Sequence, residues 1–122
     1  MIFKQLFDLK SSTYTYLISS GKGREALIID PVIDNVREYI NLLKELDLKL
    51  VKVIDTHIHA DHVTGASKLQ DITKCVTVMG DHTPADAVEI RVKDDECINL
   101  DYLKLRAMYT PGHTSDSYSF LM

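Results

Sequence analysis

The feature that most constrains this fold is an apolar strand, a helix and a second apolar strand in immediate succession. Residues 26–29 read Ala-Leu-Ile-Ile and stop at Asp30. Residues 35–46 carry apolar side chains at helical spacing behind Asp34, which is placed to cap the helix, and residues 50–54 are again mainly apolar. Such strands are buried on both faces, as in sheets with parallel strands. The succession predicts an α/β fold with helices outside a sheet.

Weaker patterns on either side extend this unit into a mixed sheet. Two strands precede it, and the glycine-containing turn at residues 19–23 predicts a hairpin with the strand 26–29. The strands expected elsewhere are residues 2–7, 13–18, 75–79, 101–109 and from 117 onward, with a helix over about 61–71 and a short helix over 84–87. The pattern is weak from 81 to 95. No repeat or linker divides the chain, so residues 1–122 are predicted to form a single domain.

Composition excludes several classes of function. The net charge is −4 with an isoelectric point near 5.6, which disfavours nucleic-acid binding. No apolar run approaches the roughly 20 residues that span a bilayer. The polar N-terminal segment, with only a short apolar stretch, is not typical of a signal peptide. The two cysteines form no CxxC pair and are expected to be buried free thiols. The expected location is the cytoplasm.

The candidate site lies directly after the predicted strand 50–54. His57, His59, Asp61 and His62 fall within six positions. Alternate residues of an extended segment share a face, so His57 and His59 project together, while Asp61 and His62 turn toward a neighbouring position. A lone histidine at a strand end is usually packed or solvated, but this clustering indicates a catalytic metal site. Imidazole suits zinc, iron, copper or nickel, and the carboxylate adds an oxygen donor.

Two further histidines lie later in the chain. His113 follows Pro111 and Gly112 in a turn, and by itself it is a weak candidate for a ligand. His82 has no potential ligand near it in the sequence and is expected to be a surface residue.

These motifs resemble a known family. Residues 56–62 are similar to the HxHxDH signature of the metallo-β-lactamase superfamily, and residues 110–114 are similar to its second motif. The resemblance covers essentially residues 1–122 and implies an αβ/βα sandwich with the metal at one edge, between two sheets. Within the superfamily, residues 3–8, 11–17 and the HxHADHxTG form of residues 57–65 resemble the persulfide dioxygenases, as does the spacing between the two motifs.

That resemblance implies a ligand set and a reaction. His57 and His113 would hold a single Fe(II), joined by an aspartate that follows the second motif beyond Met122. The implied reaction oxidises glutathione persulfide to sulfite and glutathione. His59 would stand at the edge of the site, and Asp61 and His62 would be catalytic residues that support the first metal or belong to a second metal position.

An alternative hypothesis is a glyoxalase II-like hydrolase, in which the same residues bind two metal ions. His57 and His59 would bind one zinc ion, Asp61 and His62 would bind a second, and a bridging water would attack the thioester of a hydroxyacylglutathione. The motif alone does not exclude this hydrolase. β-Lactam hydrolysis is disfavoured, since nothing in the sequence selects a lactam pocket.

A third hypothesis is that the chain is an inactive fragment or an interaction module. The resemblance implies an aspartate ligand and a second half of the sandwich after Met122, so the chain is expected to be part of a longer protein. The C-terminal part of the sandwich would then be missing. The sheet face left uncovered would favour self-association or a homodimer.

Overall fold

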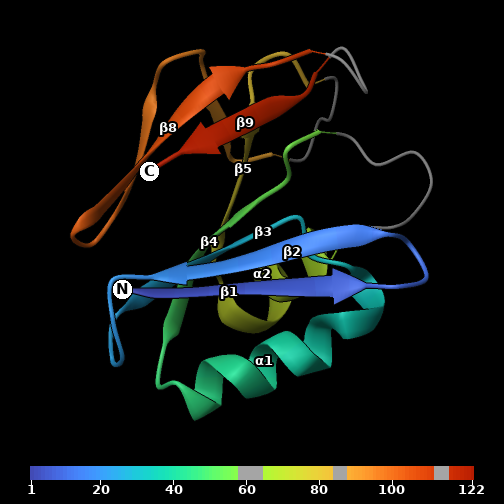
Figure 1. The fold of residues 1–122 in the computed structure, drawn as a ribbon, viewed down its shortest axis with the longest axis vertical. Coiled ribbons are helices and arrows are strands. Elements are labelled where there is room, and N and C mark those ends of the chain that lie inside the picture. Colours follow the sequence, from blue (N-terminus) through green and yellow to red (C-terminus); the bar gives the residue numbers. More distant parts are fainter. Residues whose placement is uncertain (58–64, 84–87, 112–115) are drawn as a thin grey trace.

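The computed structural model describes residues 1–57, 65–83, 88–111 and 116–122. Within them, strands and helices form two sheets and one helical layer (Figure 1). The elements are β1 (Ile2–Asp8), β2 (Thr13–Ser19), β3 (Glu25–Ile29), a 3-10 turn (Ile33–Asn35), α1 (Val36–Glu45), β4 (Lys49–Ile54), α2 (Ala66–Thr73), β5 (Val76–Gly80), β6 (Ile90–Val92), β7 (Cys97–Leu100), β8 (Leu103–Tyr109) and β9 (Tyr118–Leu121).

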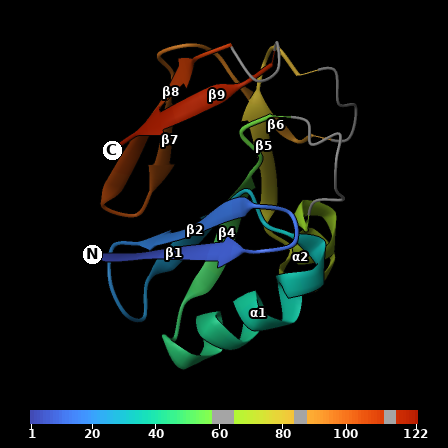
Figure 2. The same ribbon diagram turned by 45° about the vertical axis from the view of Figure 1, so that its right-hand side comes forward.

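The larger sheet has six strands in the order β1-β2-β3-β4-β5-β6. The pairs β1/β2 and β2/β3 are antiparallel, and β3/β4, β4/β5 and β5/β6 are parallel. The predicted hairpin and mixed sheet are therefore confirmed. Helices α1 and α2 cover one face of this sheet, and the antiparallel sheet β7-β8-β9 lies across the other face (Figure 2).

Alternation along the central strands supplies two separate cores. Leu17, Ile28 and Val53 point to the helices, whereas their neighbours Ile18 and Ile54 point to the smaller sheet. Because successive side chains of a strand face opposite ways, an apolar strand can serve both layers at once. The prediction that residues 26–29 are buried on both faces is confirmed, and this burial fixes β3 and β4 at the centre of the domain.

The first helix begins later than predicted. Residues 33–35 form a 3-10 turn, α1 starts at Val36, and neither Asp34 nor Asn35 caps it through a side-chain hydrogen bond. Asn35 instead donates to the Asp8 carboxylate, with 3.0 Å between Nδ2 and Oδ1. Hydrogen bonds from the Ser11 hydroxyl, the Ser11 N–H and Asn35 hold the pKa of Asp8 below its usual value. This contact ties the β1–β2 turn to the start of the helix.

One predicted strand begins later than expected, and two strands, β6 and β7, were not predicted. Residues 101 and 102 form the turn between β7 and β8, with φ of 52° at Asp101, so the predicted strand 101–109 begins only at Leu103. The weakly patterned segment contains the short strand β6, which pairs with β5. Cys75 is buried as predicted, but Cys97 is exposed, and both are free thiols. The predicted short helix at 84–87 lies outside the described residues.

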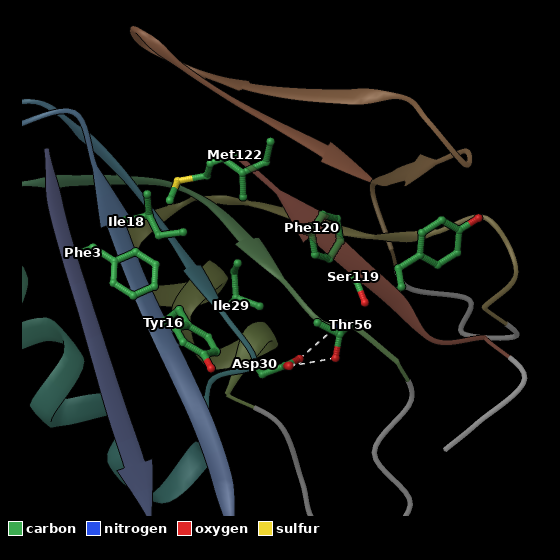
Figure 3. A pocket seen from close by; sticks show the side chains of 11 residues that line it. Phe3, Tyr16, Ile18, Ile29, Asp30, Thr56, Ser119, Phe120 and Met122 are labelled. Carbon is green, nitrogen blue, oxygen red and sulfur yellow. Dashed lines mark hydrogen bonds between the residues drawn. The ribbon is translucent and has the colours of Figure 1, made fainter. Parts of the chain in front are cut away.

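A groove of about 480 Å³ runs between the two sheets. Figure 3 shows Phe3, Tyr16 and Ile18 on one side and Phe120 and Met122 on the other. Phe3 and Met122 remain about half exposed, so apolar side chains line an open surface here. Self-association through this face stays a prediction. None of the described helices is both long and apolar enough to cross a membrane.

Candidate metal centre

The candidate centre lies where the parallel strands end. Strands β3, β4 and β5 run in the same direction, so their carboxyl ends meet at one edge of the sheet. Asp30 follows β3, residues 55–57 follow β4, and Asp81 follows β5. The Asp55 N–H donates to the Val78 carbonyl at 3.2 Å, which continues the pairing of β4 with β5 past the end of the strand. Polar side chains from three strands are thus gathered at this edge.

His57 is held through its neighbour Thr56. The Thr56 N–H donates to Asp30 Oδ1 at 2.8 Å, and the Thr56 hydroxyl donates to Asp30 Oδ2, also at 2.8 Å (Figure 3). The same hydroxyl oxygen lies 2.9 Å from Nδ1 of the His57 ring. Asp30 therefore binds both polar groups of Thr56, and Thr56 in turn contacts the imidazole.

Asp30 is itself fixed by its backbone. Its φ of 54° lies in the left-handed region, where aspartate is among the few tolerated residues, and proline follows it. The Asp30 N–H donates to the Ile54 carbonyl at 2.7 Å, and its carbonyl accepts the Thr15 hydroxyl at 2.7 Å. Such a conformation persists only where surrounding contacts over-determine it, and such positions cluster at functional sites.

A buried tyrosine of α1 supports the Asp30 backbone through Thr15. The Tyr39 hydroxyl lies 3.1 Å from the Thr15 hydroxyl and accepts the Val32 N–H at 3.0 Å. Both side chains are almost fully buried. Since the one proton of Thr15 goes to the Asp30 carbonyl, Tyr39 must donate to Thr15. A directed chain of hydrogen bonds thus links α1 to Asp30.

The described residues on either side of segment 58–64 are both bound to the Asp30-Pro31 turn. At one end, Thr56 is bound to Asp30; at the other, the Gly65 N–H donates to the Pro31 carbonyl at 2.8 Å. A Cβ at Gly65 would lie 2.9 Å from Val36 Cγ2 and 3.3 Å from Pro31 Cβ, so a larger residue would push α2 away. The Asp30-Pro31 turn therefore fixes Thr56 and Gly65 relative to each other.

Strand β9 closes the other side of the centre. The Tyr118 N–H donates to the Thr56 carbonyl at 2.8 Å, and the Tyr118 hydroxyl donates to Asp81 Oδ1 at 2.6 Å. The ring lies directly over Gly80, where a Cβ would approach ring carbons to 2.0 Å. Burial, together with the hydrogen bond and the charge of Asp81, raises the pKa of Tyr118. Tyr118 thus holds the smaller sheet to the ends of β4 and β5.

His82 has partners that the sequence did not reveal. It is about half exposed, as expected for a surface residue, but its ring stacks on Tyr109 with centroids 3.7 Å apart and planes 3° apart. Its Nε2 atom lies 3.8 Å from Asp81 Oδ1. His82, Tyr109 and Tyr118 form an aromatic cluster beside the candidate centre.

Of the predicted metal ligands and catalytic residues, only His57 belongs to the part of the chain that the structure describes. His59, Asp61, His62 and His113 lie outside it. Among the described residues, no three His, Cys, Asp or Glu side chains are grouped as a metal site. The surroundings of His57 fit a metal ligand, because its Nδ1 is engaged by Thr56 and imidazole is a donor that iron and zinc both accept.

Sequence reasoning missed the roles of Asp30 and Tyr118. The Asp30-Pro31 pair at the end of a buried strand resembles the metallo-β-lactamase superfamily, but the sequence does not indicate that the Asp30 carboxylate binds Thr56. Tyr118 carried no such signal, because its partners at residues 56, 80 and 81 are distant in the sequence.

Comparison with known proteins is consistent with this geometry. Residues 10–122 match the family model of the metallo-beta-lactamase superfamily. The chain is 35% identical over its whole length to the mitochondrial persulfide dioxygenase ETHE1 of Bos taurus, of which it covers 48%. It is 34% identical over 88% of its length to a hydroxyacylglutathione hydrolase of Francisella tularensis subsp. novicida, of which it covers 42%.

A solved structure agrees closely in fold. The crystal structure of ETHE1 from Myxococcus xanthus superposes with a TM-score of 0.94 and 42% identity, over 99% of this chain and 53% of that one. The chain thus spans about half the length of the relatives that it matches. The resemblance to the superfamily, including its persulfide dioxygenases, and the predicted α/β fold are confirmed. The chain belongs to the metallo-beta-lactamase superfamily.

Proposed function

We propose that this chain carries the metal-binding edge of an iron-dependent persulfide dioxygenase. The observation that supports this most directly is the 35% identity to a persulfide dioxygenase along the whole chain. The arrangement at His57 supports it too, since Asp30 and Thr56 orient an imidazole at the start of the histidine motif. In the proposal, His57 and His113 bind one Fe(II), and His59, Asp61 and His62 lie close to it.

The proposed substrate is glutathione persulfide. Its outer sulfur gives four electrons to dioxygen, water supplies the third sulfite oxygen, and the products are glutathione, sulfite and two protons. The iron ion, when bound, supplies the redox chemistry of a non-haem oxygenase with two histidines and one carboxylate. The chain orients His57 through Thr56. Tyr118 binds the Thr56 carbonyl and so covers one side of the same edge of the sheet.

Persulfide oxidation and thioester hydrolysis can be distinguished by the metal ion that the protein binds and by the product that it releases. A protein that carries this chain together with the proposed aspartate ligand and the second half of the sandwich, loaded with Fe(II) without oxygen and then given glutathione persulfide and oxygen, should consume oxygen and release sulfite. His57→Ala should lose both the iron and the sulfite production. His82→Ala removes an imidazole outside the proposed ligand set and is the matched control, which should retain iron. Sulfite release that does not depend on iron, or on His57, would contradict the proposal.

The second candidate is a dizinc hydroxyacylglutathione hydrolase. It is favoured by the 34% identity to such an enzyme over most of the chain. In this version His57 and His59 bind one zinc ion, and Asp61 and His62 bind the other. Two zinc ions per chain, with hydrolysis of a hydroxyacylglutathione and no sulfite from the persulfide, would replace the first proposal with this one.

A further inference from the structure

The direction of the hydrogen bonds around Thr56 follows from which groups lie within hydrogen-bond distance and from the protons that each can donate. Both oxygens of the Asp30 carboxylate accept from Thr56, one from its N–H and one from its hydroxyl, each at 2.8 Å. A threonine hydroxyl has a single proton to donate. Because that proton goes to Asp30, the hydroxyl oxygen can only accept in its 2.9 Å contact with His57 Nδ1. The proton of the neutral ring therefore lies on Nδ1.

We propose that Asp30 and Thr56 are positioning residues that select this tautomer of His57 and so present its Nε2 lone pair to a divalent metal ion. The imidazole can coordinate a metal only through a nitrogen without a proton. A hydrogen bond to the other nitrogen fixes both the tautomer and the orientation of the ring. Asp30 thus acts on the metal through two intervening groups, without touching it.

The backbone around Asp30 is built to hold this arrangement. Its left-handed φ is fixed by the hydrogen bonds to Ile54 and Thr15 described above, and Tyr39 fixes Thr15 in turn. These contacts leave the carboxylate facing Thr56 with both of its oxygens used. The inference rests on the proposed function only for the role of His57 as a metal ligand; the tautomer follows from the hydrogen bonds alone.

The variant that tests this direction is Asp30→Asn. Asparagine has nearly the same shape and tolerates the left-handed conformation at least as well as aspartate. Its oxygen can still accept the Thr56 N–H, but its NH₂ group would then face the Thr56 hydroxyl and donate to it. The hydroxyl proton would turn to His57 Nδ1, which must accept, and the ring proton would move to Nε2. Replacing a tautomer-fixing aspartate by asparagine produces this kind of reversal while leaving the geometry intact.

The measurement is the nitrogen-15 NMR spectrum of the metal-free chain with labelled histidine, assigned by comparison with His57→Gln. We expect a protonated Nδ1 in the unsubstituted chain and a protonated Nε2 in Asp30→Asn. Competition titration with Zn²⁺ as the probe should show affinity weakened by about 10- to 100-fold in Asp30→Asn. Thr56→Ser keeps the hydroxyl and should behave like the unsubstituted chain, whereas Thr56→Val should lose affinity to a similar extent as Asp30→Asn.

A protonated Nε2 in the unsubstituted chain would overturn the inference. So would an unchanged tautomer in Asp30→Asn together with Zn²⁺ affinity within twofold of the original. If Asp30→Asn does not fold, equal Zn²⁺ affinity of Thr56→Ser and Thr56→Val refutes it by itself. Loss of persulfide oxidation with the expected tautomer intact would remove the proposed function and leave this inference standing.

Discussion

Substitution of Gly80 by alanine tests how the two sheets are joined. Gly80 ends β5 beneath the Tyr118 ring, and an added Cβ would lie 2.0 Å from two of its ring carbons. The ring is 2% exposed and is held by hydrogen bonds at both its hydroxyl and its backbone N–H. Because the hydroxyl and the backbone are both held, the ring can move off Gly80 only by breaking one of these hydrogen bonds or by displacing β9 from the end of β5.

The magnitude follows from three contributions. Forcing an extra methyl group into a packed core costs about 1–3 kcal/mol. Weakening the hydrogen bond between Tyr118 and Asp81 adds about 0.5–1.5 kcal/mol. Replacing glycine by alanine in a strand returns about 0.5–1 kcal/mol. Together they lower the free energy of unfolding by about 0.5–4 kcal/mol, with a central value of about 2 kcal/mol, and that central value lowers the melting temperature of a domain of this size by roughly 6–12 °C.

Urea and thermal unfolding followed by circular dichroism would measure this change. Gly21→Ala is the matched control, because an added Cβ there would meet nothing within 4 Å, and it should leave stability nearly unchanged. In a Tyr118→Leu background the clash is relieved, so Gly80→Ala should then cost less than about 0.5 kcal/mol. If Gly80→Ala is as stable as the original chain, the packing of Tyr118 on Gly80 is not what joins the sheets.

Three further measurements address other parts of the structure. Tyr39→Phe should lower the free energy of unfolding by about 1–3 kcal/mol, since it leaves buried partners without their hydrogen bonds, whereas Tyr14→Phe, on a half-exposed side chain, should be neutral in the same unfolding assay. A thiol-alkylating reagent should label Cys97 in the folded chain and spare Cys75, because burial raises the pKa of the Cys75 thiol; rapid labelling of both, read by mass spectrometry, would contradict this. The folded-state pKa of Asp8 is lowered, so its hydrogen bonds stabilise the fold above the unfolded pKa of about 3.9 and this contribution is lost as pH falls through the lower folded value. A carbon-13 NMR titration of Asp8 should give a midpoint below its usual value, and an ordinary midpoint would refute the assignment.

The central strands could be predicted because their own residues specify them. The run Ala-Leu-Ile-Ile at residues 26–29 is apolar on both faces, so its burial and its place between two layers follow from local sequence. The start of α1 could not be read in this way. Asp34 has the chemistry of a cap, but tertiary contact with Asp8 draws Asn35 into a 3-10 turn instead.

The candidate site was only partly accessible from the sequence. The histidine motif marks the end of β4 by its spacing, and His57 lies at that strand end. The Asp30–Thr56 contact joins residues that follow two different strands, and these residues become neighbours only when β3 and β4 pair in parallel. The Tyr118–Gly80 packing depends similarly on a long-range approach of β9 to β5. Local pattern marks the candidate ligands, whereas tertiary pairing brings Asp30 and Thr56 together beside His57.

The hydrogen bond from Tyr118 to Thr56 also orders events during synthesis. A chain translated through β5 already contains β3, β4 and His57, so Asp30 and Thr56 have what they need to pair. Tyr118, which holds the Thr56 carbonyl from the other side, is added only near the end of these 122 residues. Contacts between distant parts of a chain form late because loop closure must precede them. Any metal binding at the proposed centre is therefore expected to follow the docking of β9, since a nascent chain contains His57 and Thr56 before Tyr118 is there to bind the Thr56 carbonyl.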